Sequence, residues 1–98
     1  MYGLIGSMTA TSGQRDMLAA ALLEGLRDMP GCLSYVVAED PMQSDKLWIT
    51  EVWDSADNHR ASLNLPQVQA AIAKARPIIA GMGDRQETRP IGGVGLQA

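Results

Sequence analysis

The sequence has little of what metal centres and disulfides require. It contains one cysteine, Cys32, and one histidine, His59, so no internal disulfide can form and no cluster of soft ligands is available for zinc or an iron–sulfur centre. A site made only of carboxylates would need convergent acidic residues, which the sequence does not indicate. The glycines at 92, 93 and 95 precede no helix, so they do not predict a phosphate-binding loop. We therefore expect a protein that carries no metal and no cofactor.

The chain also lacks a concentration of positive charge and a long apolar run. Its formal net charge is −3 and its eight basic residues are scattered, which gives no case for binding nucleic acid or an anionic membrane surface. No signal-like N-terminus and no membrane-spanning segment are evident, so we expect a soluble, cytoplasmic protein. With 98 residues, 46% of them hydrophobic, the chain is expected to form a single domain over 1–98, with an irregular tail at 91–98.

The apolar pattern predicts the element order βαββαβ. The expected strands alternate apolar and polar side chains and cover residues 2–9, 32–39, 46–53 and 84–90. A first helix is expected between the capping-box pair Thr11 and Gln14 and the stop at Pro30-Gly31. The second helical region is expected in two parts, one over 55–63 and one from Pro66 whose apolar stripe runs on to Ile79, with Pro77 kinking or ending it.

This order indicates an α+β fold of the ferredoxin-like type. Right-handed crossovers would place both helical regions on one face of a four-stranded antiparallel sheet. The opposite face would then carry Trp48, Val52 and other apolar side chains in contact with water. Each apolar side chain that is exposed rather than buried forgoes about 1.5–3 kcal/mol. We therefore expect two copies to pair through this face as a homodimer.

The strand at 46–53 carries the most informative residues. Glu51 and Trp53 share a face with Leu47 and Ile49, while Trp48 lies on the other face. In a functional interpretation, Trp53 stacks on a flat aromatic ligand and Glu51 binds a hydroxyl group or a proton. In a structural interpretation, Trp53 is a core residue and Glu51 pairs with an arginine or a backbone amide near the rim of the sheet.

Two further residues are candidates for the same site. His59 follows the Trp53 strand and is the natural general base near neutral pH; the alternative is a solvated helix residue among polar neighbours. Tyr35 faces the same way on the neighbouring strand, either to pack or to donate a hydrogen bond to a ligand. No serine stands in a nucleophile elbow, so hydrolysis by a triad is not expected.

These residues resemble the antibiotic biosynthesis monooxygenase superfamily over roughly residues 2–90. The similarity lies in Pro30-Gly31-Cys32 before a strand, in Tyr35, in the Asp40-Pro41 turn, and in the Glu51-to-Ser55 segment that leads into a helix with His59. The resemblance implies a dimeric α/β barrel, whose members include enzymes that oxidise phenols or quinols with O₂ and without metal or flavin. It implies that His59 or Glu51 is the base and that Trp53 and Tyr35 bind a small aromatic substrate.

The sequence departs from the haem-degrading members of that superfamily. Those relatives use an asparagine on the first strand and a histidine on the last long helix, whereas this chain has Gly6-Ser7 on the strand and no histidine after Pro66. Haem degradation is therefore disfavoured. Two alternatives to a monooxygenase stay open: a non-catalytic dimeric module that binds a ligand, and an isomerase or cyclase that uses the same base without O₂.

Overall fold

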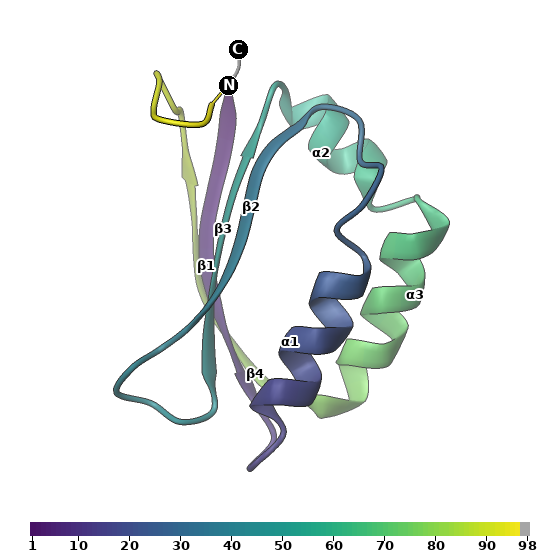
Figure 1. Ribbon diagram of the computed structural model, residues 1–98, viewed down its shortest axis with the longest axis vertical. Helices are drawn as coiled ribbons and strands as arrows, with labels where there is room; N and C mark the ends of the chain where they lie inside the picture. The colour runs from purple at the N-terminus through teal and green to yellow at the C-terminus, as the bar shows by residue number, and fades with distance from the viewer. Residues whose placement is uncertain (97–98) are drawn as a thin grey trace.

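The computed structural model describes residues 1–96 and contains four strands and three α-helices (Figure 1). Their order and bounds are β1 (Tyr2–Ala10), α1 (Arg15–Glu24), β2 (Cys32–Glu39), β3 (Lys46–Trp53), α2 (Ala56–Ser62), α3 (Pro66–Ala75) and β4 (Ile79–Thr88). A short 3₁₀ turn, η1 (Arg76–Ile78), joins α3 to β4. Because η1 contains Pro77, which cannot continue an α-helix, the predicted end of the second helical region is confirmed.

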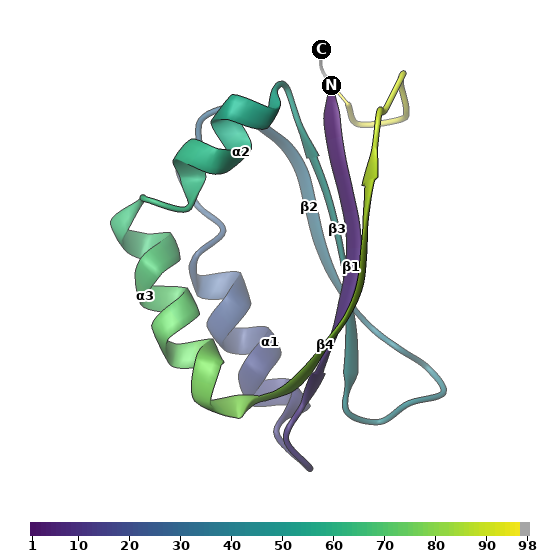
Figure 2. The ribbon, with the colours of Figure 1, turned by 180° about the vertical axis from the view of Figure 1, so that it is seen from behind.

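The strands form one antiparallel sheet in the order β2-β3-β1-β4. Figures 1 and 2 show all three helices on the same side of this sheet and no helix on the opposite side. We call the side with the helices the inner face and the opposite side the outer face. The predicted α+β, ferredoxin-like arrangement is confirmed.

The core lies at one end of the layer between sheet and helices. Leu18 of α1 and Leu47 of β3 are completely buried there, together with Ala10, Ala21 and Ala75. The two long helices approach closely: a Cβ atom on Gly25, just after α1, would lie 2.8 Å from the Cβ of Ala71 in α3. Small residues at this crossing therefore bring α1 and α3 together, and the helices then cover the sheet as a pair.

The predicted start of the first helix is wrong in detail. The helix begins at Arg15, and Gln14 occupies its N-cap position without a side-chain hydrogen bond. The backbone N–H of Thr11 instead donates to the carbonyl of Ile78, and Gly13 has a φ of 76° that interrupts any helix between Thr11 and Gln14. The helix also ends at Glu24, well before Pro30-Gly31.

The last strand starts five residues earlier than predicted and ends at Thr88. Ile79, expected on the helical stripe, is its first residue. The segment contains Gly81 and Gly83, which do not favour a strand locally, but it pairs with β1 from Ala10 back to Gly3. A Cβ atom on Gly83 would lie 2.0 Å from the Oγ of Ser7, so a larger residue there would force the serine hydroxyl to move.

The described residues after β4, 89–96, form no helix or strand. Ile91 and Val94 lie exposed in this segment. The prediction of an irregular tail over 91–98 is met as far as residue 96, and its last two residues lie outside the described part of the chain. No helix within residues 1–96 is long and apolar enough to cross a membrane.

Candidate functional site

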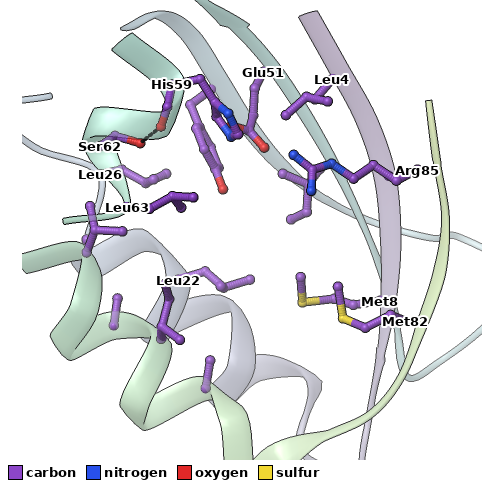
Figure 3. Close-up of a pocket in the computed structure, with 18 of the residues that line it drawn as sticks. Leu4, Met8, Leu22, Leu26, Glu51, His59, Ser62, Leu63, Met82 and Arg85 are labelled. Carbon is purple, nitrogen blue, oxygen red and sulfur yellow. Dashed lines mark hydrogen bonds and ion pairs between the residues drawn. The ribbon is translucent and has the colours of Figure 1, made fainter. Parts of the chain in front are cut away.

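A cavity of about 360 Å³ lies between the inner face of the sheet and the helices (Figure 3). This size falls in the range of small-molecule sites. Most of its lining is aliphatic or thioether, from Leu4, Met8, Leu22, Leu26, Met29, Ile49, Val68, Ile72 and Met82. The polar side chains Tyr35, Glu51, His59 and Arg85 also contribute to the lining, so the cavity combines an apolar body with a small polar region.

Strand β3 supplies the carboxylate and the tryptophan of the polar region. Alternation along the strand directs both Glu51 and Trp53 to the inner face. Trp53 is only 1% exposed, and its indole Nε1–H donates to Glu51 Oε1 at 3.0 Å. The indole is therefore both a core residue and part of the cavity wall, and its hydrogen bond fixes one oxygen of the carboxylate.

Helix α2 brings the histidine over this carboxylate. Ser55 caps the helix by accepting a hydrogen bond from the backbone N–H of Asn58 at 3.1 Å, which sets where the helix begins. His59 is 8% exposed, and its Nε2 lies 3.7 Å from Glu51 Oε1. Its ring meets the edge of Trp53 with 5.5 Å between centroids. His59 is thus a buried residue of the cavity wall, not a solvated helix residue.

Burial controls the protonation of the histidine. Loss of hydration lowers the pKa of His59 below its ordinary value, and the positive charge of Arg85 acts in the same direction. The negative charge of Glu51 opposes these effects without overcoming them. The imidazole is therefore neutral near pH 7, as a proton acceptor must be, and Glu51 is placed to stabilise the imidazolium that would form.

Tyr35 lies beside the same carboxylate on the neighbouring strand. It pairs with Glu51 in the register of β2 and β3. Burial, followed by the negative charge of Glu51, raises the pKa of its phenol, so the hydroxyl remains a hydrogen-bond donor. Burial likewise raises the pKa of Cys32, which keeps this residue a thiol and agrees with a structural role.

The structure therefore brings all four predicted site residues to one cavity. It also adds Arg85 to the cavity lining and places Tyr2 against His59, and sequence reasoning missed both residues. The ring of Tyr2 lies 5.4 Å from that of His59, and its hydroxyl donates to Glu87 Oε1 at 2.9 Å. The sequence held one signal for Tyr2, which shares a strand face with Leu4, but none for Arg85.

The arrangement is suited to removing a proton from a ligand bound in a largely apolar cavity. A neutral imidazole backed by a carboxylate can accept the proton, and the phenol of Tyr35 can donate a hydrogen bond. Within residues 1–96, no three His, Cys, Asp or Glu side chains converge in a way that could hold a metal ion.

The sequence profile of the antibiotic biosynthesis monooxygenase family matches residues 1–74. The chain belongs to this family. The match ends before β4, so it includes Tyr35, Glu51, Trp53 and His59 but not Arg85. The segment that matches the profile thus supplies most of the cavity wall, and β4, which follows that segment, adds Arg85.

Solved structures of similar proteins support the same assignment. A protein from Chloroflexus aurantiacus, provisionally named an antibiotic biosynthesis monooxygenase, is 61% identical, with a TM-score of 0.95 over 98% of both chains. A Caulobacter crescentus protein is 17% identical, with a TM-score of 0.83 over 93% of this chain and 90% of its own, and shows the fold alone. A Deinococcus radiodurans protein, 24% identical with a TM-score of 0.77 over the full length of both chains, does the same. No curated protein matches the sequence.

Proposed function

We propose that this protein is a cofactor-independent monooxygenase that oxidises a small quinol, phenol or polycyclic aromatic with O₂. The observation that carries the proposal is the pair of Glu51 and His59, held 3.7 Å apart at one end of a mostly apolar cavity. The provisional naming of the 61% identical Chloroflexus aurantiacus protein as a monooxygenase points in the same direction.

The proposed reaction begins when His59 takes the hydroxyl proton of the bound aromatic. The resulting anion is electron-rich enough to give an electron to O₂, and recombination forms a carbon–oxygen bond. For a substrate with a reactive ring CH₂ group, one oxygen atom replaces two hydrogens and the other leaves as water. The substrate supplies every electron, so the protein provides only a base, a dry cavity and stabilisation of charge.

In this proposal the protein works as a homodimer. On the outer face, Ile5, Val36 and Trp48 are between 38% and 48% exposed, although they lie on three adjacent strands. The register places Ile5 and Val36 on either side of Thr50. An apolar sheet surface of this kind is stabilised when a second copy covers it.

Oxygen consumption tests the proposed reaction. Metal-stripped protein is mixed with quinols and anthrones in an oxygen electrode, and we expect uptake that depends on the protein. His59→Ala should lower turnover by about 10²–10⁴-fold and leave substrate binding nearly unchanged. Arg60→Ala is the matched control, since Arg60 is the exposed neighbour on the same helix.

Three other outcomes would contradict the proposal. Turnover that persists under argon would indicate an isomerase or cyclase. Ligand binding without turnover would indicate a binding module. Equal activity of the His59→Ala and Arg60→Ala variants would remove His59 from the reaction and leave Glu51 as the candidate base.

A further inference from the structure

One arginine reaches the polar end of the cavity from the edge strand β4. Arg85 pairs with Gly6 in the register of β4 and β1. A Cβ atom on Gly6 would lie 3.9 Å from Arg85 Cγ, so the glycine leaves the surface of β1 clear where the arginine side chain lies across it. Figure 3 shows the guanidinium group extending from β4 into the cavity, on the side of Glu51 and His59.

The charge of Arg85 acts on the ionisable side chains of this end. Burial is the main influence on Tyr35 and His59, raising the pKa of the phenol and lowering that of the imidazole. The positive charge of Arg85 lowers the pKa of both groups, so it favours the phenolate of Tyr35 and the neutral imidazole of His59. A positive charge in this place stabilises any negative charge that develops in the cavity.

Two carboxylates on the inner face, those of Glu51 and Glu87, each have one oxygen in a hydrogen bond with another residue. One oxygen of Glu51 accepts the hydrogen bond from Trp53 and faces His59. Glu87, two residues further along β4, accepts the hydroxyl of Tyr2. In the part of the chain that the structure describes, Arg85 takes part in no salt bridge. Its guanidinium N–H groups are therefore available to a ligand.

We propose that Arg85 holds the ionised hydroxyl of the bound aromatic, and hence that the substrates are phenols, naphthols or enols able to ionise within the cavity. This inference rests on the function proposed above and adds the group that receives the oxygen once its proton has left. The O–H bond breaks, the proton passes to the neutral imidazole of His59, and the electron pair stays on the oxygen. The guanidinium then donates a charge-assisted hydrogen bond to that oxygen.

A second arginine in the lining provides a matched control. Arg76 of η1 also contributes to the cavity wall. However, η1 lies at the end of β1, because the backbone N–H of Thr11 donates to the carbonyl of Ile78. His59 lies at the other end of the cavity, beside Tyr2 at the start of β1. Arg76 therefore has the same charge at the opposite end of the cavity, and the proposal assigns it no contact with the hydroxyl.

The test uses two probes of nearly equal size, 4-nitrophenol, whose anion is yellow, and nitrobenzene, which has no hydroxyl. Dissociation constants are measured by titration for the full chain and for Arg85→Gln, Arg85→Lys and Arg76→Gln. Loss of a charge-assisted hydrogen bond should weaken binding of the 4-nitrophenol anion to Arg85→Gln by about 10- to 100-fold. The same variant should raise the pKa of the bound 4-nitrophenol.

Nitrobenzene should bind all variants equally, Arg85→Lys should retain part of the preference for the anion, and Arg76→Gln should lose much less affinity for the anion than Arg85→Gln does. Three results would overturn the proposal: an equal loss for both probes in Arg85→Gln, a loss confined to Arg76→Gln, or no binding of the anion to the parent protein. Because no turnover is involved, this inference can fail while oxygen uptake succeeds. The converse also holds, so the two proposals are tested separately.

Discussion

The two faces of the sheet differ in burial, although alternate residues of the same strands form them. On the inner face, the helices bury Leu47 and Trp53 almost completely, yet leave a cavity beside the polar pair of Glu51 and His59. On the outer face, Val36 and Trp48 stay partly exposed: the ammonium group of Lys46 lies over the Trp48 ring, but no helix covers this side of the sheet.

Because side chains alternate between the two faces of a β-strand, neighbouring residues of β3 can have different roles: one set lines the cavity and the other set lies on the outer face. On the inner face His59 is buried, which lowers the pKa of its imidazole and makes a proton acceptor at neutral pH. The outer face has apolar area without cover, which suits a flat partner and not a small molecule. The following predictions test that contrast, beginning with the largest expected effect.

The two tryptophans give the most direct comparison of the faces. Trp53→Ala should lower the free energy of unfolding by about 3–5 kcal/mol, because it removes a fully buried indole and leaves a larger cavity. Measured in the monomeric Val36→Glu background, Trp48→Ala should cost less, since its indole is 38% exposed in the protomer and its Nε1–H hydrogen bond to Asp40 lies at the surface. Denaturant titration measures both, and equal losses would contradict the contrast. Ligand binding by Trp53→Ala must therefore be measured only where the variant is folded.

The assembly prediction concerns the outer face alone. Val36→Glu should convert the proposed dimer to a folded monomer of 10.5 kDa, because association would bury a charge without a partner. Met17→Glu makes the same kind of change at an exposed position of α1 in the helical layer, and should leave the dimer intact. Light scattering coupled to size-exclusion chromatography distinguishes the two. A parent protein that is monomeric, or a Val36→Glu variant that stays dimeric, would refute the proposed interface.

The alternation of apolar and polar side chains along β3 allowed much of this architecture to be predicted from the sequence. The placement of Glu51 and Trp53 on one face, and of Trp48 on the other, follows from the period of the strand. The helix expected over 55–63 likewise forms as α2, and Ser55 caps it. In these segments the local pattern and the tertiary structure agree, so short-range reasoning was sufficient.

Where long-range contacts decide, the sequence was less informative. Thr11 has capping spacing, but its backbone is held by Ile78 from the far end of the chain. The start of β4 is set by pairing with β1, against its own glycine content. Arg85 was missed for the same reason, because its place at the cavity depends on the register that puts it beside Gly6. No local pattern encodes that register.

The smallest predicted effect is a dependence of stability on pH that belongs to the inner face. His59 has a folded-state pKa below the ordinary value of 6.5, so above that pH both folded and unfolded states are neutral at this residue. As the pH falls below 6.5, the unfolded chain binds the proton first, and stability is lost until the folded state is protonated as well. Urea titrations of the parent protein should therefore show lower stability in mild acid, and His59→Gln should show a smaller decrease.

Arg60→His is the control, since it places a second imidazole on the exposed side of the same helix, beside Asp57. An exposed imidazole titrates with nearly the same pKa in both states, so this variant should lose no more stability in acid than the parent protein. If the parent protein and His59→Gln lost stability equally between about pH 7 and pH 5, the imidazole would not be desolvated in the folded state. The cavity would then be wet at its polar end, and His59 would titrate like a surface residue.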